Sequence, residues 1–373
     1  MGDDNIQMQR LGFDDEQRKQ YEQNPIEYNK QITRFLSQAR EQAKRETCFI
    51  CGKRCSSFCK SHSVPKFALK NIAVNGKVIF SGIQQEYPAG LPVLGKDYGI
   101  GDAGTFSLIC NDCDNTLFQD YESPSAYESE PSGKILAQIA MKDYLHMIGK
   151  RYYELEMDSL CKEQNPNYPY YPQNEVEAKK LDLNDYEKAF KKAKIASNGG
   201  HDDWYSLFYY RKLDYVVPYA AQSMVTLISD FNDDVINYIY NFDADYHTSA
   251  LHVAVFPLAS SSIIIMFTES NSNRYRKFSK QFRKLSEDDQ LSAINYIIIS
   301  YIENVFLSKN MSKEVMDNPF FRDASRKTAY AITPHGYHKD GLIDRAIEEF
   351  SLSKRHCVPN LLGREYALSK LSN

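Results

Sequence analysis

The 373-residue sequence contains no apolar run approaching the roughly 18 residues that a membrane-spanning helix requires. It has one tryptophan, and its net charge of −4 argues against a general affinity for nucleic acid over the whole surface. The first six residues, Met-Gly-Asp-Asp-Asn-Ile, contain neither an apolar signal core nor the Ser or Thr that myristoylation needs at position 6. From these absences we expect a soluble, cytoplasmic protein with no membrane partner.

The remaining composition is that of a globular protein, with 42% apolar and 25% charged residues. The length is sufficient for two or three domains. There are eight cysteines. In the reducing cytoplasm, cysteines act as metal ligands or free thiols more often than they form disulfides.

Four of the cysteines form two Cys-x-x-Cys pairs, Cys48 with Cys51 and Cys110 with Cys113. Each pair can place two thiolates on one tetrahedral ion, so the two pairs together predict a structural zinc site. An iron–sulfur cluster held by Cys48, Cys51, Cys55 and Cys59 is an alternative. Its spacing matches neither ferredoxin type, which favours loop or free thiols at Cys55 and Cys59.

A histidine lies between the two pairs, in His62-Ser-Val-Pro65. A histidine held beside a metal knuckle is suited to act as a general base or metal ligand in phosphodiester cleavage. Two structural roles compete with this interpretation. His62 could ligate the zinc, with Cys59-x-x-His62 as half of a zinc site, or it could cap a turn.

Three segments resemble the zinc-knuckle branch of the HNH endonucleases, which have a treble-clef or ββα-metal fold. The resemblance covers residues 47–122. It implies that His62 is the general base and that Asn115 or Asp114 helps to hold a catalytic divalent ion, Mg2+ or another metal. The segments are Cys48-Phe-Ile-Cys51, Ser61-His-Ser-Val-Pro-Lys66 and Leu108-Ile-Cys-Asn-Asp-Cys-Asp-Asn115.

The resemblance further implies a metal-dependent endonuclease that acts on DNA, or alternatively on RNA, with defence against foreign DNA as a family-level role and a possible partner protein or trigger. The chain departs from the family at Ser61, where an acidic residue or histidine is common, and at Thr105, where an asparagine is usual. Asp102 or Asp112 could supply the missing ligand. These departures favour a rival interpretation, a non-catalytic zinc module that recognises nucleic acid or protein. A third interpretation places the function in the C-terminal body.

Positive charge is concentrated around the first cysteine pair. Residues 40–70 contain eight basic residues and two acidic ones, a local charge of +6. This predicts contact with a nucleic-acid backbone through Lys53, Arg54, Lys60 and Lys66. Residues 273–284 also alternate basic with aromatic residues, but there a packed helix is favoured over a binding surface. His335, His338 and Asp340 match no metal motif and predict a loop.

The expected fold class is α+β, in three parts. Residues 1–46 form a helical arm of two short helices broken at Pro25, residues 47–122 form the zinc module with strands and loops inserted between its knuckles, and residues 123–373 form a mostly helical body. Within the body we expect helices over 134–158, 183–197 and 286–306, a helix beginning at Pro218, and a β-hairpin over 249–268.

Overall fold

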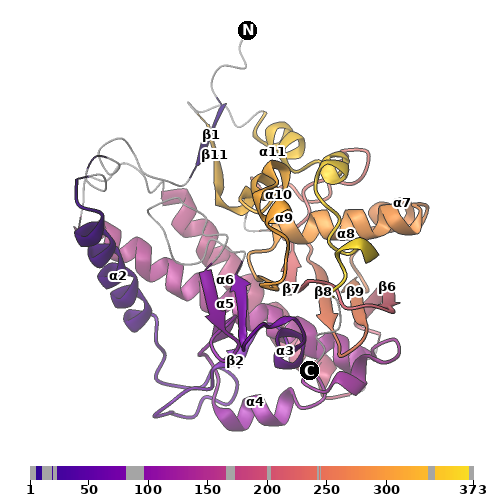
Figure 1. Ribbon diagram of the computed structural model, residues 1–373. Coiled ribbons are helices and arrows are strands. Elements are labelled where there is room, and N and C mark those ends of the chain that lie inside the picture. The colour runs from indigo at the N-terminus through magenta and orange to yellow at the C-terminus, as the bar shows by residue number, and fades with distance from the viewer. Residues whose placement is uncertain are drawn as a thin grey trace.

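A computed structural model describes residues 6–10, 19, 23–80, 96–164, 173–199, 203–241, 243, 245–334 and 341–368. It combines helices with an extensive antiparallel sheet, which confirms the predicted α+β class (Figure 1). Within these ranges no helix is both long and apolar enough to cross a bilayer.

The N-terminal arm contains α2 (Pro25–Gln42), which begins at the proline where the sequence predicted a break. Proline is favoured at the first helical position because its missing N–H has no intrahelical partner there. The side chain of Asn24 caps the helix by accepting from the N–H of Glu27 at 3.2 Å. Leu36 and Ala39 are buried, and α2 packs on α5 (Gly133–Gln164). The helix predicted before Pro25 lies largely outside the described residues.

Seven strands form the central sheet, and every neighbouring pair is antiparallel. The predicted hairpin is confirmed as β8 and β9, inside this larger sheet. The apolar, β-branched runs of both strands are buried along almost their whole length, as central strands require. In spatial order the strands are β4 (Lys96–Gly99), β3 (Lys77–Phe80), β10 (Val305–Leu307), β7 (Tyr219–Val225), β8 (Leu251–Pro257), β9 (Ser262–Glu269) and β6 (Tyr205–Leu213).

Two predictions in this region are wrong. Pro218 precedes strand β7 instead of opening a helix, and proline is tolerated there because it stands at the strand boundary. The predicted helix over 286–306 is α8 (Glu287–Tyr301), which ends five residues early. The chain then becomes β10, whose buried side chains pair with β3 and β7.

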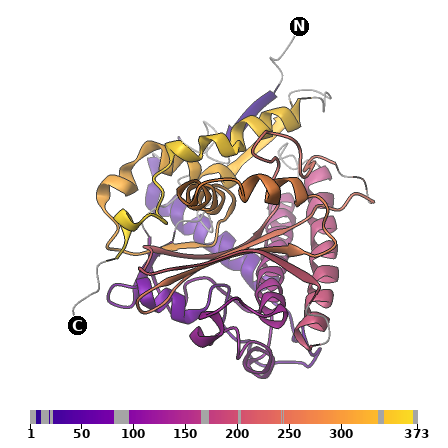
Figure 2. The ribbon, with the colours of Figure 1, turned by 90° about the vertical axis from the view of Figure 1, so that its right-hand side faces the viewer.

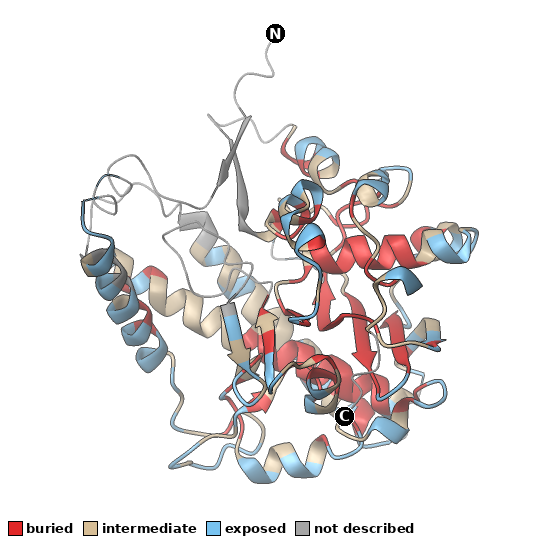
Figure 3. Cartoon of the chain, in the orientation of Figure 1, coloured by how far each residue is buried: buried red, intermediate tan, exposed pale blue. Residues whose placement is uncertain are grey.

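Helices cover both faces of the sheet, so the body has three layers (Figure 2). Alternate residues of each strand point to opposite faces: Val253 and Val255 pack with α8, whereas Ala254 and Phe256 pack with α5 and α3 (Lys66–Ile72). Figure 3 shows the buried residues concentrated in the sheet, α8 and the adjoining part of α5. The predicted helix over 134–158 is α5, and that over 183–197 is the second half of α6 (Gln173–Ser197).

The zinc module is joined to the body through the sheet. Its strands β3 and β4 extend the seven-stranded sheet through β10, while β2 (Ser61–His62) and β5 (Thr105–Phe106) form a separate two-stranded ladder. Helix α4 (Asn111–Leu117) begins at the second cysteine pair. The module is therefore held by the strands inserted between its own knuckles.

The C-terminal part adds α7 (Arg276–Phe282), α9 (Lys313–Asp317), α10 (Pro319–Ala324) and α11 (Leu342–Phe350), and β11 (Tyr330–Pro334) pairs with β1 (Ile6–Arg10). Phe278 and Phe282 are buried, which confirms the packed-helix interpretation of residues 273–284. The predicted loop with His335, His338 and Asp340 lies outside the described residues.

Candidate metal centre and the neighbouring histidine

The four predicted zinc ligands come together in one group. The sulfur atoms of Cys48, Cys51, Cys110 and Cys113 all lie within 4.8 Å of one another. The Sγ atoms of Cys51 and Cys110 are 3.9 Å apart, close to the roughly 3.8 Å edge of a tetrahedron with Zn–S bonds of about 2.3 Å. The geometry thus fits one tetrahedral ion.

Local backbone geometry builds the first knuckle. The N–H of Gly52 donates to the carbonyl of Cys48 at 2.9 Å, and the N–H of Cys48 donates to the carbonyl of Lys53 at 2.9 Å. Gly52 adopts φ of 71°, a left-handed conformation that glycine reaches without strain. The second pair begins α4, with Cys110 at its N-cap and Cys113 in its first turn.

The electrostatics of the site are compatible with a bound cation. Burial opposes ionisation of Cys48, but backbone N–H groups, including that of Cys110 at 3.3 Å, outweigh it and lower the Cys48 pKa to about 6. Burial and the crowded neighbouring sulfurs raise the pKa of Cys113. Four thiolates coexist at this spacing only around a positive ion. Four sulfurs would leave no open position on a tetrahedral ion, which makes the set compatible with a structural zinc.

Cys55 and Cys59 lie outside this group, so the alternative cluster of Cys48, Cys51, Cys55 and Cys59 does not form. The thiol of Cys55 donates to the carbonyl of Lys53 at 3.3 Å. The thiol of Cys59 donates to the carboxylate of Asp114 at 3.4 Å. Both are free thiols, as expected.

His62 also lies outside the sulfur group, which makes it unavailable as a zinc ligand in this structure. It stands on β2, half-buried, with Nε2 2.9 Å from the carbonyl oxygen of Ile100. A carbonyl oxygen only accepts, so Nε2 carries the hydrogen and Nδ1 of the neutral ring keeps its lone pair. Burial, helped by the charges of Lys66 and Lys142, holds the pKa of His62 below its usual value of 6.5. The ring is therefore neutral at pH 7.

The glycine preceding Thr105 fixes the loop opposite His62. Thr105 pairs directly with His62 across the β2–β5 ladder. Gly104 has φ of 65°, and a Cβ there would lie 2.7 Å from the ring of Phe306 and 2.8 Å from Oγ of Ser63. The backbone of this loop supports the histidine strand without any side chain at that position.

Asp114 is occupied by other groups. Its Oδ1 accepts from Ser61 Oγ at 2.6 Å and from Lys142 Nζ at 2.9 Å, and Lys142 also donates to Ser61 at 2.7 Å. Burial raises the pKa of Asp114, but Lys142 and the hydrogen bonds outweigh it, and the pKa is lowered overall. Its carboxylate is thus ionised and neutralised by Lys142.

The other residues predicted to bind a catalytic metal do not form a common ligand group. Asn115 is exposed on α4, Asp112 is exposed, and Asp102 forms an exposed ion pair with Lys60 at 2.6 Å. In the described ranges, the four cysteines are the only group of three or more His, Cys, Asp or Glu ligand atoms close enough to share an ion. A catalytic Mg2+ therefore has no complete set of protein ligands among them.

The structure adds one residue that the sequence analysis missed, Lys142, and shows the contacts of a second, Glu122. Lys142 is fully buried, and its Nζ lies 4.1 Å from the ring centre of Phe118. Glu122 accepts the backbone N–H of Lys66 at 3.1 Å, and burial raises its pKa. The signal for Lys142 was available, because it interrupts the apolar stretch between Ile139 and Leu145.

The four residues predicted to bind nucleic acid are exposed, but only two of them form an ion pair with a described acidic residue. Arg54 pairs with Glu46 at 3.0 Å, and Lys60 pairs with Asp102. Lys53 and Lys66 form no ion pair with a described residue, and Lys66 begins α3, four residues after His62. Lys66 is therefore the cation without an ion pair to a described residue that lies nearest to His62 in sequence, although its charge also acts on the carboxylate of Glu122.

A buried polar chain connects the histidine strand to the sheet. Ser63 donates to Asn304 at 3.0 Å, and Asn304 donates to the backbone carbonyl of Gln222 on β7 at 3.0 Å. The Gln222 side chain donates to Asp143 at 2.8 Å, and Asp143 contacts His252 Nδ1 at 2.7 Å. The His252–Asp143 pair is buried and connects α5 to strand β8 of the sheet.

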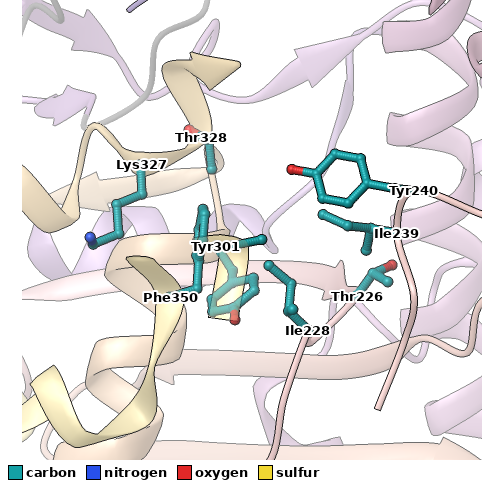
Figure 4. Close-up of a pocket in the computed structure, with 9 residues that line it drawn as sticks. Thr226, Ile228, Ile239, Tyr240, Tyr301, Lys327, Thr328 and Phe350 are labelled. Carbon is teal, nitrogen blue, oxygen red and sulfur yellow. The ribbon is translucent and has the colours of Figure 1, made fainter. Parts of the chain in front are cut away.

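The C-terminal body contains an open pocket of about 270 Å³ (Figure 4). Aliphatic and aromatic side chains dominate its lining. None of the site residues predicted from the sequence contributes to it. The lining residues are Thr226, Ile228, Ile239, Tyr240, Tyr301, Lys327, Thr328, Ala346 and Phe350.

No model of a known protein family matches this chain, and no curated protein or solved structure matches it either. The likeness to HNH endonucleases therefore rests on three short segments of the sequence.

Proposed function

We propose that the protein is a metal-dependent HNH-type endonuclease that cleaves DNA, with His62 as its general base beside a structural zinc centre. The observation that carries the proposal is the state of the His62 ring. Its Nε2–H is held by the carbonyl of Ile100, and its neutral Nδ1 can accept a proton. A general base must hold a lone pair at the operating pH, and a neutral His62 ring would supply one at Nδ1.

In the proposed reaction, Nδ1 of His62 takes a proton from water as the water oxygen attacks phosphorus. The bond from phosphorus to the leaving oxygen breaks, and that oxygen is protonated by solvent. Lys66, which is exposed and forms no ion pair with a described residue, would attract the phosphate backbone. A divalent ion would neutralise charge on the phosphate.

The ion would have to be held mainly by substrate and water. Mg2+ commonly binds through one or two protein oxygens together with phosphates and waters, so a site that assembles with the substrate suits it. Asn115 remains the proposed protein contact because it is exposed on α4. We assign Asp114 a positioning role instead, because Ser61, Lys142 and Cys59 already occupy its carboxylate.

A second function is favoured by one observation, the lack of a preassembled catalytic metal set in the described ranges. A zinc module that binds nucleic acid without cutting it would need only the four cysteines and the exposed cations. The zinc-loaded protein, incubated with supercoiled DNA and Mg2+ or Mn2+, separates the two functions. Nicking that stops when His62 becomes alanine supports the endonuclease. Salt-sensitive binding without nicking supports the recognition module.

A further inference from the structure

We propose that Lys142 and Asp114 couple occupancy of the four-cysteine centre to the position of His62. This regulatory role rests on the proposed function in one respect: the position of His62 matters because His62 is the proposed general base. The coupling itself is a property of the fold that can be measured without cleavage. It adds a positioning residue, Lys142, from a helix outside the zinc module.

The connection is short. Cys113, a ligand of the centre, is followed directly by Asp114 on α4, and Ser61 directly precedes His62 on β2. Asp114 and Ser61 are joined by a hydrogen bond of 2.6 Å. Metal bound through Cys113 would thus fix Asp114, and Asp114 holds Ser61, the residue next to His62.

Lys142 closes this connection into a triangle. Its Nζ donates to Ser61 at 2.7 Å and to Asp114 at 2.9 Å, while the face of the Phe118 ring lies 4.1 Å away. The lysine side chain is 0% exposed and that of Asp114 is 18% exposed, so water does little to screen the pair. A buried charge left without its partner is strongly unfavourable, so α4 and β2 must keep one relative position.

Stability alone is a weak reason for such a triangle. Buried ion pairs are often no more stabilising than apolar residues of similar volume, and their better-attested effect is to specify one arrangement. The arrangement specified here is that of the metal-bearing helix against the histidine strand. Loss of the ion would free Cys110 and Cys113, and the displacement of α4 would pass through Asp114 and Ser61 to His62.

The test follows the His62 ring by NMR in protein labelled with 13C at histidine, with the signal assigned from His62→Gln. Zinc-loaded and metal-free forms are compared for the wild type, for Ser61→Ala, and for the charge-free pair Lys142→Met with Asp114→Asn. Lys134→Ala is the matched control, because Lys134 also lies on α5 and forms an ion pair of 2.6 Å, but an exposed one, with Asp120 beyond α4.

We expect metal removal to shift the His62 signal in the wild type and in Lys134→Ala, while the signal of His252, buried in the sheet, stays in place. In the other two proteins zinc should still bind at about one ion per chain, and the His62 shift should fall by at least half. An equal shift in all four proteins, or none in the wild type, overturns the proposal. A simultaneous shift of His252 also overturns it, because the centre would then act through global unfolding.

Hydrogen exchange in the zinc-loaded proteins provides a second readout. The N–H of Ser63 donates to the carbonyl of Gly104 beside the β2–β5 ladder. Loss of the Ser61 contact with a charged partner should speed its exchange by roughly 10- to 100-fold in Ser61→Ala, with no change in Lys134→Ala. Equal exchange in both variants contradicts the coupling. A wild type that never cleaves DNA, yet shows both effects, refutes the endonuclease and leaves the coupling intact.

Discussion

Replacing Asp143 by alanine should destabilise the protein more than any exposed acid-to-alanine change near the site. The carboxylate is buried, and it accepts from Gln222 Nε2 at 2.8 Å and contacts His252 Nδ1 at 2.7 Å. Alanine removes both acceptor oxygens and leaves two buried donors without their main partner. Each such donor costs about 1–3 kcal/mol.

Two features reduce the total cost. Gln222 Nε2 also lies 3.3 Å from the carbonyl of Ile139, and His252 Nε2 lies 3.4 Å from the hydroxyl of Tyr144, so both groups have a weak second contact. We therefore expect a loss of about 2–4 kcal/mol in the free energy of unfolding, including the small cavity.

The assay is equilibrium unfolding in urea at pH 7.5 with zinc present throughout. Asp120→Ala is the control, because the exposed ion pair of Asp120 with Lys134 should contribute about 1 kcal/mol or less. Asp143→Asn should fall between the two, since its amide oxygen can still accept one hydrogen bond. A loss below about 1 kcal/mol in Asp143→Ala would refute the view that the buried hydrogen bonds of Asp143 link α5 to the sheet.

Three further predictions concern the site. Because the pKa of His62 is below 6.5, cleavage should persist as pH falls through 6.5 and decline only at lower pH, where the ring binds a proton; a decline centred above 6.5 would contradict this. Cys55→Ser should retain about one zinc per chain by metal analysis, whereas Cys110→Ser should lose it, and equal zinc in both would remove Cys110 from the centre. Lys66→Ala should weaken DNA binding and reduce the log–log salt slope by about one. Lys60→Ala should have a smaller effect, because Asp102 already neutralises Lys60. A slope in Lys66→Ala equal to that of the wild type would exclude a phosphate contact at Lys66.

The parts of the structure that sequence spacing could predict are local. Cys48 and Cys51, or Cys110 and Cys113, fix their own geometry through short turns, and the metal requirement joins the two pairs. The β8–β9 hairpin is equally local, since its two buried strands are separated by a short turn. In each case the interacting residues are close in sequence or share one ligand.

The remaining features depend on contacts between distant segments. Strand β10 has three residues and pairs with Phe80 and Ala220, so no local pattern marks it as part of a sheet. Asp114 was predicted to help hold a metal. Its partner in the structure, Lys142, lies on another helix, so no local sequence pattern pointed to it. A lysine in an apolar helical stretch signals a buried partner, but only the fold identifies that partner as Asp114.

The most direct test of the proposed function is DNA cleavage by His62→Ala alongside the wild type, with zinc content and folding measured on the same samples. We predict that wild-type protein nicks supercoiled DNA in Mg2+ or Mn2+. The variant should keep its zinc, because four sulfurs close the centre without the histidine, and should cleave roughly 10²–10⁴-fold more slowly. Undiminished cleavage by His62→Ala, or loss of its zinc, would contradict a catalytic His62 beside a structural metal centre.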